Sequence, residues 1–369
     1  MADTELTYKI ALSLINGLHA DNGTELLERV GTPQRYFEMS PTDLRRQAHL
    51  SEKLCDAAMR AGLLEKARSE EEFVLSHRIR TYFFTDPDYP KLLRECPDAP
   101  AMLYVLGDAD LDNPRPVSIV GTRHNTPYGD NFNTRFVREL AELVDGLSII
   151  SGLAYGTDIC AHRSAMRSHV PTVAVLANAL DTIYPAEHRA DAVKIIQEGG
   201  AIVSETPRCV SVSRRSFLQR NRIIAGLSKA TIVVESGCSG GSMTTARLAY
   251  EYNRDVFAVP GRAFDMYSRG TNAIIAAQKA TLLQSAEDFV LAMRWPVKKI
   301  EGTQQELPIE LDTQQKRILE LIEANPIINV NELCRAMTMS YAELTDTVFR
   351  MEMRGLINSL PGGIFSINH

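Results

Sequence analysis

Glycine and serine residues follow four predicted strands, at positions where a backbone could hold a phosphate group. The apolar runs 117–120, 147–150, 230–235 and 255–259 each lead directly into a short loop of small residues. In a parallel α/β sheet such loops meet at the carboxyl edge, where free backbone N–H groups attract anions. One glycine loop is weak evidence because tight turns use glycine anyway, but four together predict an anion-binding floor. Its candidate residues are Gly121, Thr122, Gly152, Gly156, Gly240, Gly241 and Ser242.

Arginine residues gather close to these loops. Arg123 follows the first strand, and the run SRRSFLQRNR (213–222) precedes a predicted helix at 223–227. Arginine suits phosphate because its planar guanidinium donates two parallel hydrogen bonds. Phe217 and Tyr184 add aromatic surface on which a base could stack. The sequence therefore predicts an anion-binding pocket whose further candidates are Arg123, Arg214, Arg215, Phe217, Arg220 and Arg222.

Catalytic and metal-binding patterns are weak by comparison. The chain contains neither GxGxxG nor GxxxxGK[ST], which disfavours an ordinary dinucleotide site and a P-loop. Asp158 and His162, four residues apart, could share a helix face, but a helix cap and a packed histidine are the simpler interpretation. The six cysteines form no CxxC pair, which favours reduced thiols over a zinc site or a disulfide framework. We therefore expect a protein that is not an enzyme and needs no cofactor or metal.

Composition is that of a globular protein, and it places one condition on DNA binding. The 369 residues are 44% hydrophobic and 23% charged, with a formal net charge of −6. A negative chain binds nucleic acid only if its basic residues gather locally. No apolar run approaches 18 residues, and the first residues lack a secretory pattern, so we expect a cytoplasmic location without membrane attachment.

The elements that must position these residues fall into separate regions. Residues 1–75 show helical periodicity and indicate a small domain of SAM or helix-hairpin-helix type, with packing or docking favoured over DNA contact. Residues 78–295 alternate short strands with helices, which predicts a Rossmann-like α/β domain whose parallel sheet is covered on both faces. Further strands are expected at 172–176 and 201–204, and helices at 128–144, 159–168, 190–198 and 244–252. The strands are almost entirely apolar, as a doubly covered sheet requires.

The carboxyl-terminal part predicts a linker at 296–311 and a winged helix at 312–369. Helices are expected near 314–324, 330–337 and 340–355, followed by a hairpin at 356–367. This region carries five basic and seven acidic side chains, so its net charge is −2. Because a DNA-binding face normally needs a surplus of cations, we expect this module to bind protein or to self-associate.

The central domain resembles the DNA-processing protein A (DprA/Smf) family. The matching runs, in the family's order, are 119–123 (IVGTR), 151–158 (SGLAYGTD), 184–185 (YP), 220–228 (RNRIIAGLS), 240–242 (GGS) and 259–262 (VPGR). Two positions depart from the family pattern: Leu218 replaces a usual proline, and Lys279 replaces a usual glycine. Neither change removes a phosphate-binding group.

The resemblance implies properties that the residues alone do not give. It implies an extended Rossmann-like fold, a homodimer, and a basic pocket for single-stranded DNA that also includes Asn221. It further implies that the protein acts as a recombination mediator. In that role the protein would protect incoming DNA, displace single-strand-binding protein and load RecA, in natural transformation or in recombinational repair.

Two other functions share this fold and stay open at this point. LOG-type phosphoribohydrolases place a catalytic glutamate soon after a PGGxGT loop, whereas the next acid here, Glu251, comes about one turn too late. Nucleotide sensing without catalysis is the other alternative.

Overall fold

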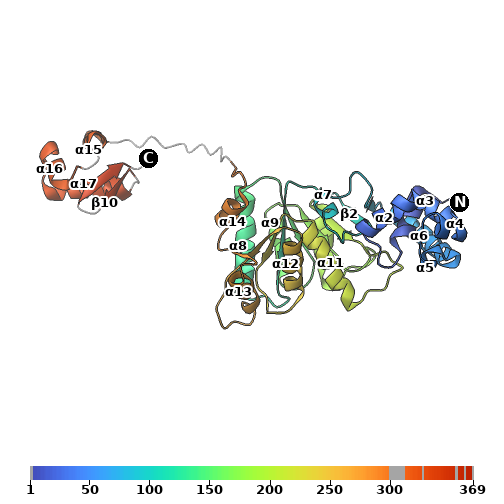
Figure 1. Cartoon of the computed structure of the whole chain (residues 1–369). Coiled ribbons are helices and arrows are strands. Elements are labelled where there is room, and N and C mark those ends of the chain that lie inside the picture. Colours follow the sequence, from blue (N-terminus) through green and yellow to red (C-terminus); the bar gives the residue numbers. More distant parts are fainter. Residues whose placement is uncertain (1–2, 299–311, 326–327, 354–355, 361–362, 368–369) are drawn as a thin grey trace. The chain divides into compact units, whose positions relative to one another are not determined.

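The computed structural model describes residues 3–298, 312–325, 328–353, 356–360 and 363–367. The chain divides into two compact units, Met1–Lys298 and Lys299–His369. Figure 1 labels the elements of both, and each unit is considered by itself.

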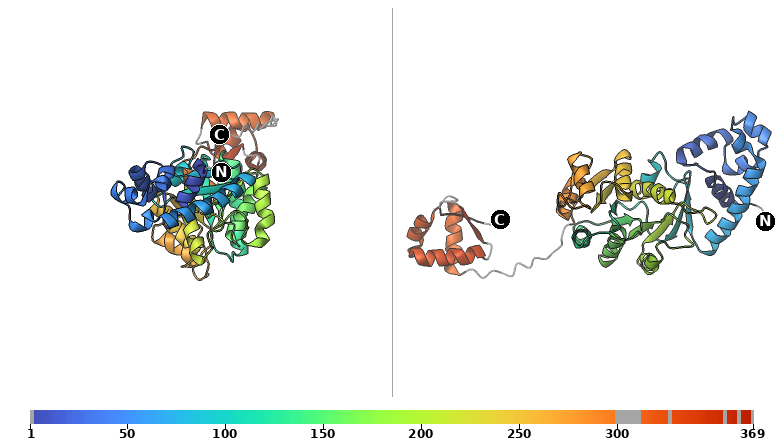
Figure 2. Two further views of the ribbon diagram at one scale, coloured as in Figure 1. Left: turned by 90° about the vertical axis from the view of Figure 1, so that its right-hand side faces the viewer. Right: turned by 90° about the horizontal axis from the view of Figure 1, so that it is seen from below.

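The first unit begins with the expected helical region. Its helices are α1 (Glu5–Ser13), α2 (Ala20–Val30), α3 (Pro33–Glu38), α4 (Pro41–Arg46), α5 (Glu52–Cys55) and α6 (Ala57–Ser76). Two of them start with a capping residue followed by proline, Thr32 before Pro33 and Ser40 before Pro41, which is a strong helix start. These helices bury Ile10, Leu12, Tyr36 and Leu44, among others. In Figures 1 and 2 they gather (blue) at the end of the sheet that carries β1 and β2.

The sheet that follows is mostly parallel. In the described part of the chain its strands are β1 (Arg80–Phe83), β2 (Met102–Gly107), β3 (Arg115–Val120), β4 (Leu147–Ser151), β5 (Thr172–Val175), β6 (Ala201–Ser204), β7 (Ala230–Val233), β8 (Asp255–Ala258) and β9 (Thr281–Leu282). Their order is β1-β2-β6-β5-β4-β3-β7-β8-β9, parallel from β6 to β9. β1 and β2 extend it antiparallel. The strands predicted from β3 to β8 are confirmed, and β1, β2 and β9 are additional.

Helices cover both faces, as the apolar strands predicted. They are α7 (Lys91–Arg94), α8 (Pro127–Leu143), α9 (Thr157–Arg167), α10 (Arg189–Gln197), α11 (Arg214–Gly226), α12 (Gly241–Glu251), α13 (Arg269–Ala276) and α14 (Ala286–Met293), with a 3-10 turn at Ala186–His188. Successive strand residues face opposite sides. Ile119 packs in one core cluster with Phe136 of α8 and Phe289 of α14. Its neighbour Val120 belongs to another cluster, together with Ile223 of α11 and Ala246 of α12.

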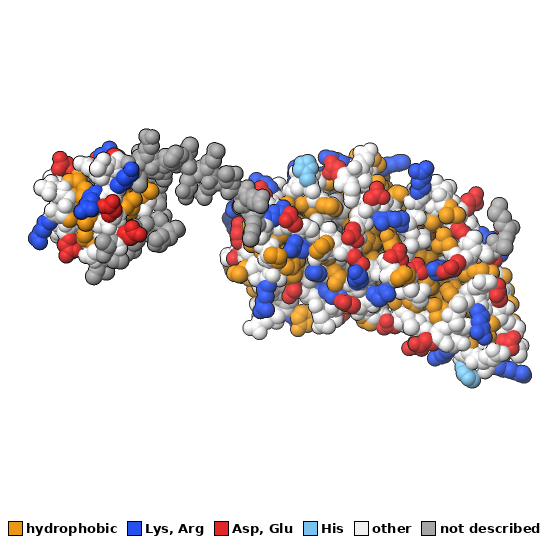
Figure 3. All heavy atoms as spheres, turned by 90° about the horizontal axis from the view of Figure 1, so that it is seen from above, with side chains coloured by type: hydrophobic (Ala, Val, Ile, Leu, Met, Phe, Trp, Pro, Cys, Tyr) orange, Lys and Arg blue, Asp and Glu red, His pale blue; other side chains and the backbone are white. Residues whose placement is uncertain are grey.

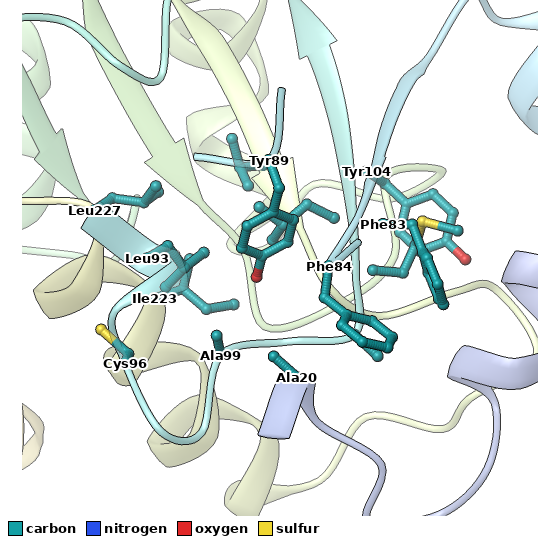
Figure 4. Packing of buried hydrophobic residues seen from close by; sticks show 14 of the residues in the cluster. Ala20, Phe83, Phe84, Tyr89, Leu93, Cys96, Ala99, Tyr104, Ile223 and Leu227 are labelled. Carbon is teal, nitrogen blue, oxygen red and sulfur yellow. The ribbon is translucent and has the colours of Figure 1, made fainter. Parts of the chain in front are cut away.

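That second cluster continues into the helical region and joins it to the sheet domain. Figure 4 shows Tyr89, Leu93 and Cys96 packed beside Ile223, with Ala20 at the start of α2 close to Ala99. The backbone N–H of Ala20 donates to the carbonyl oxygen of Ala99 at 2.8 Å. The two regions therefore share one continuous apolar core.

Arg208, in the loop between β6 and α11, makes a further contact to the helical region. Its Nε donates to a carboxylate oxygen of buried Glu70 on α6 at 3.1 Å, and its backbone N–H donates to the same oxygen at 3.2 Å. The guanidinium also lies 4.2 Å from the centre of the Phe73 ring, within cation–π range. The loop that leads into α11 is thus held against α6.

The second unit has the predicted winged-helix elements. They are α15 (Thr313–Ala324), α16 (Val330–Met337), α17 (Tyr341–Met353), β10 (Ile357–Leu360) and β11 (Ile364–Ile367), and the two strands pair antiparallel. Its core includes Ile318, Leu333, Leu344 and Met351. Residues 361–362 of the predicted hairpin and residues 299–311 of the predicted linker lie outside the described residues. Lys298, inside the predicted linker, still packs on the first unit, where its N–H donates to Leu143 at 2.7 Å.

Candidate nucleic-acid interface

A pocket of about 1020 Å³ lies where the strand order reverses. From β3 the chain moves outward through β4, β5 and β6, and it then returns to place β7 on the other side of β3. Ligands of open α/β sheets bind outside the carboxyl ends of the strands at this kind of switch point. Loops after β3 and β7, the first turns of α11 and α12, and the segment before α13 line the pocket. The topology therefore brings together loops that are more than a hundred residues apart.

Most of the predicted site residues line this pocket. They are Gly121, Thr122, Arg123, Arg214, Phe217, Arg220, Asn221, Gly240, Gly241 and Ser242. Gly152 lines a small adjoining cavity of about 20 Å³, together with Arg123, Phe217 and Arg220. Gly156 lies instead under the loop that follows β3 and borders a separate open groove of about 360 Å³. Arg215 and Arg222 also lie outside the pocket.

The positions of Arg215 and Arg222 differ from expectation because α11 starts earlier than predicted. The helix begins at Arg214 rather than near Ile223, and Ser213 caps it in a capping box with Ser216. The arginine run therefore turns with the helix. Residues 214, 217, 218 and 221 follow the i, i+3, i+4, i+7 spacing of one helix face, and all four line the pocket.

Arg215 and Arg222 are seven residues apart and share another face of α11. Arg215 is exposed to solvent. Arg222 forms an ion pair with Glu205, and the two side chains are only 15% and 23% exposed. Burial raises the pKa of Glu205, and Arg222 opposes that rise. This arginine is therefore engaged in stabilising the fold around the end of β6.

Arg220 lies beneath the pocket floor. Its Nη1 donates to the carbonyl oxygen of Gly152 at 2.6 Å and also to that of Val175. Burial lowers the pKa of Arg220 to about 10, although nearby Asp158 opposes the change. Burial likewise raises the pKa of Asp158, against the effect of Arg220. The two side chains compensate each other, so this pair contributes little net charge to the pocket.

Three other arginines supply the positive charge of the pocket. Arg123, Arg214 and Arg269 line it, all are exposed, and none forms an ion pair with another residue that the structure describes. Elsewhere charges are mixed: basic and acidic side chains are interspersed over the face of the first unit seen in Figure 3. The local surplus of cations that DNA binding demands is therefore present at this pocket in a chain of net charge −6.

Aromatic rings stand beside these cations. The Arg123 guanidinium lies 6.0 Å from the centre of the Phe217 ring, and the Phe217 and Tyr184 rings meet edge to face at 5.6 Å. Phe217 is half-buried, whereas Tyr184 is 54% exposed. Exposed aromatic faces next to cations are what unpaired bases and their phosphates need.

Glycines bring the backbone close to the space where an anion would lie. A Cβ on Gly121 would come within 2.3 Å of Thr157 Oγ1 and 2.9 Å of the Glu235 carbonyl oxygen, so only glycine fits there. Gly240 has a φ of 152°, a conformation that favours glycine, and it caps α12. Asn221 of α11 fixes the first turn of α12, because its Nδ2 donates to the Gly241 carbonyl oxygen at 3.2 Å. Its unpaired N–H groups are suited to anions.

The loop before α12 also matches the pattern GxSxG of serine hydrolases, at residues 237–241. In that enzyme class the serine lies on a sharp strand-to-helix turn. Here β7 ends at Val233 and α12 starts at Gly241, so Ser239 lies in a longer loop. No hydrogen bond joins Ser239 to a histidine in the described part of the chain.

Sequence reasoning missed several residues of the pocket. Arg269, Tyr267 and His124 line it but were not among the candidates. The loop after β8 was expected to approach the site at residues 260–262. The part of this loop that lines the pocket lies instead within 266–269. The sequence signal that could have identified Arg269 is the glycine that follows it. Gly270 packs against Gly237 of the pocket loop with no room for a Cβ, which places Arg269 beside the pocket.

The structure also places the other side chains considered for catalysis or metal binding. His162 is fully buried in α9, and its Nδ1 lies 2.7 Å from Thr172 Oγ1. Asp158, one turn earlier in α9, is also buried, and it lines the pocket together with Arg220. Among the described residues, no group of three or more His, Cys, Asp and Glu side chains could hold a metal ion. All six cysteines are unpaired. No described helix has both the length and the apolar character to cross a bilayer.

Comparison with known proteins assigns the family. The family described as DNA recombination-mediator protein A matches residues 80–294, and the DprA winged helix domain matches residues 303–363. Protein Smf of Escherichia coli is 32% identical over 279 residues, which is 74% of each chain. Protein Smf of Synechocystis is 29% identical over 406 residues, which is 98% of each chain.

Solved structures agree with this assignment. DNA processing protein A from Streptococcus pneumoniae superposes with a TM-score of 0.64 at 29% identity, over 79% of this chain and 98% of the other. The protein from Helicobacter pylori, whose structure was solved for its single-stranded DNA binding mode, has a TM-score of 0.52 at 32% identity, over 59% and 96%. The chain belongs to the DNA recombination-mediator protein A (DprA/Smf) family.

Proposed function

We propose that this protein binds single-stranded DNA in the pocket at the switch point and acts as a recombination mediator, not as an enzyme. One observation carries the proposal: Arg123, Arg214 and Arg269 surround glycine-rich loops and lie next to exposed aromatic rings. The Helicobacter pylori relative, which shares this fold, binds single-stranded DNA.

Binding of this kind would show little dependence on base sequence. The arginines and the backbone N–H groups of the glycine loops contact phosphates, which are the same at every nucleotide. Aromatic rings stack on any base because each base has a π face. We therefore expect strong salt dependence and weak sequence preference.

The family supports the wider role. Acting as a homodimer in the cytoplasm, the protein would hold incoming single strands, displace single-strand-binding protein and transfer the strand to RecA. Natural transformation and recombinational repair both need this step. The proposed division of labour assigns DNA binding to residues 78–295, docking to the helical domain 1–75, and protein contacts to the winged helix 312–369 beyond a linker at 296–311.

A titration with labelled oligo-dT tests DNA binding. In fluorescence anisotropy, replacing both Arg123 and Arg214 by glutamine should weaken binding and reduce the log–log salt slope by roughly 0.7 per lost phosphate contact. Arg215→Gln is the matched control, because Arg215 is an exposed arginine of the same helix that lies outside the pocket. Equal affinity and slope for the double variant and the wild type would place the DNA elsewhere.

The phosphoribohydrolase alternative has less support. Glu251 lies at the end of α12, forms an ion pair with Arg247 at 2.6 Å and does not line the pocket. The acid that does line it, Asp158, is compensated by Arg220. Incubation with nucleoside monophosphates should release no free base, and release would favour the enzyme. Tight binding of a mononucleotide without turnover would favour nucleotide sensing.

A further inference from the structure

We propose that His124 and Tyr267 form a second base-stacking subsite, on the opposite side of the pocket from Tyr184 and Phe217. The proposal rests on the proposed function, since its ligand is an unpaired base of the same DNA strand. His124 and Tyr267 line the pocket but are not part of its glycine-rich anion-binding loops.

Two adjacent residues of the loop after β3 contact different aromatic residues of the pocket. Arg123 turns toward Phe217, with its guanidinium 6.0 Å from the ring centre. The next residue, His124, has its ring centre 6.5 Å from that of Tyr267, at an interplanar angle of 31°. Both distances are within the usual range for aromatic and cation–π contacts. Adjacent residues thus serve two different aromatic pairs.

The backbone around Tyr267 is held firmly in place. The Tyr267 carbonyl oxygen accepts a hydrogen bond from Ser236 N–H at 2.6 Å, and Gly270 N–H donates to the Ser236 carbonyl oxygen at 2.9 Å. A Cβ on Gly270 would lie 2.2 Å from the Gly237 carbonyl oxygen, so the two segments are in direct contact. Tyr267 is half-buried and His124 is exposed, so the pair keeps ring surface available to a ligand.

A phosphate partner lies next to this pair. Arg269, two residues beyond Tyr267, is exposed, lines the pocket and forms no ion pair with any described residue. On the other side, Arg123 and Arg214 accompany Phe217 and Tyr184. Each aromatic pair therefore has its own arginine, which is the combination found where proteins hold single strands.

The separation of the two pairs indicates the length of the ligand. Tyr184 follows β5 and Tyr267 follows β8, and these strands are four positions apart in the sheet order. At about 4.8 Å per strand the carboxyl ends are roughly 19 Å apart. A strand of several nucleotides that crosses the glycine loops from the β5 side to the β8 side would contact both pairs. In a duplex the base faces are covered by neighbouring base pairs, so this arrangement selects single strands.

Binding of dT20 to the full chain tests the subsite. The variant with His124→Ala and Tyr267→Ala should bind dT20 about tenfold more weakly, as expected for one lost stack. Its salt slope should equal that of the wild type, because no phosphate contact is removed. Tyr267→Phe, which keeps the ring, should retain wild-type affinity. Tyr250→Ala removes a 56% exposed tyrosine outside the pocket and should have no effect.

An abasic phosphodiester strand of the same length separates stacking from backbone contacts. The wild type and the double variant should bind it equally. His124→Ala alone, which removes an exposed side chain, should give an intermediate loss on dT20 and guards against a folding defect in the double variant. Unchanged dT20 affinity in the double variant, or a reduced salt slope, would overturn the subsite while the proposed function stands. Failure of the wild type to bind dT20 would overturn the proposed function itself.

Discussion

Arg220 and Gly152 are joined by a 2.6 Å hydrogen bond from the arginine Nη1 to the glycine carbonyl oxygen, and there is no space between them for a methyl group. A Cβ on Gly152 would lie 2.6 Å from Arg220 Nη1 and 2.6 Å from Asp158 Oδ2. The glycine is thus required by the close packing of the buried Arg220 and Asp158 side chains, and not only by the ligand.

We expect Gly152→Ala to displace Arg220 and to weaken both folding and DNA binding. The overpacking should lower the free energy of unfolding by about 1–3 kcal/mol, measured by urea denaturation. The dT20 affinity should fall in parallel. Gly62→Ala is the control, because a Cβ at Gly62 meets no atom within 4 Å. It lies inside α6, so it should be neutral or slightly stabilising. An alanine at 152 without effect on either measurement would show that the floor can rearrange.

Arg222→Gln should affect stability and leave DNA binding nearly unchanged, whereas Arg214→Gln should do the reverse. Loss of Arg222 leaves Glu205 without its ion-pair partner and should cost about 1–3 kcal/mol of folding free energy. Arg214 is exposed and forms no ion pair with a described residue, so its loss should not alter unfolding. Urea denaturation and fluorescence anisotropy on both variants test these opposite effects on stability and DNA binding. Strongly reduced DNA affinity in a folded Arg222→Gln protein would contradict it.

His162 should make the fold sensitive to acid. Thr172 Oγ1 donates to the Ile149 carbonyl oxygen at 2.8 Å, so it accepts from His162 Nδ1–H, and the imidazole is neutral. Burial lowers the pKa of His162 from 6.5 to about 3. Between these values the unfolded chain binds a proton that the folded chain does not. Stability is therefore lost as the pH falls below 6.5, by about 1.4 kcal/mol per pH unit.

The variant His162→Asn isolates this effect. Its amide can donate to Thr172 without titrating, so it should be less stable at neutral pH but lose less stability between pH 6 and about 4. Urea denaturation at several pH values measures the difference in slope. Equal slopes for the two proteins would mean that another group dominates the acid response.

Removal of residues 312–369 should leave dT20 affinity within a few-fold of the full chain. The winged helix belongs to a separate compact unit, and its net charge is −2. Arg350 is paired with Asp346 and Arg317 with Glu320, which further reduces its attraction for phosphate. Light scattering on both proteins would show whether the module contributes to self-association. A collapse of DNA affinity would instead identify the winged helix as a DNA-binding element.

The sequence predicted the strands and the carboxyl-edge loops well because both depend on local patterns. Apolar runs such as 117–120 are long enough to mark buried strands, and small residues recur after four of these runs. The start of α11 was not predicted, since residues 214–222 lack apolar periodicity and the helix depends on the Ser213 cap. An error of nine residues in that start was enough to misplace Arg222.

Contacts between distant segments could not be predicted from local patterns. Glu205 precedes Arg222 by seventeen residues, and nothing in their spacing marks the ion pair. His124 and Tyr267 are separated by more than a hundred residues and meet only because β3 and β8 lie on either side of β7. Tertiary topology, and not composition, determines which of the arginines face the pocket.

The contact of Arg208 with Glu70 and Phe73 has a consequence for dissecting this protein by truncation. Arg208 lies six residues before Arg214, so α6 steadies the approach to the helix that forms one side of the pocket. A fragment that starts at residue 78 lacks both partners of Arg208. Weakened DNA binding by such a fragment would reflect the lost contacts of Arg208 with α6, which hold the loop before α11 in place. It would not measure DNA contacts made by the amino-terminal helices.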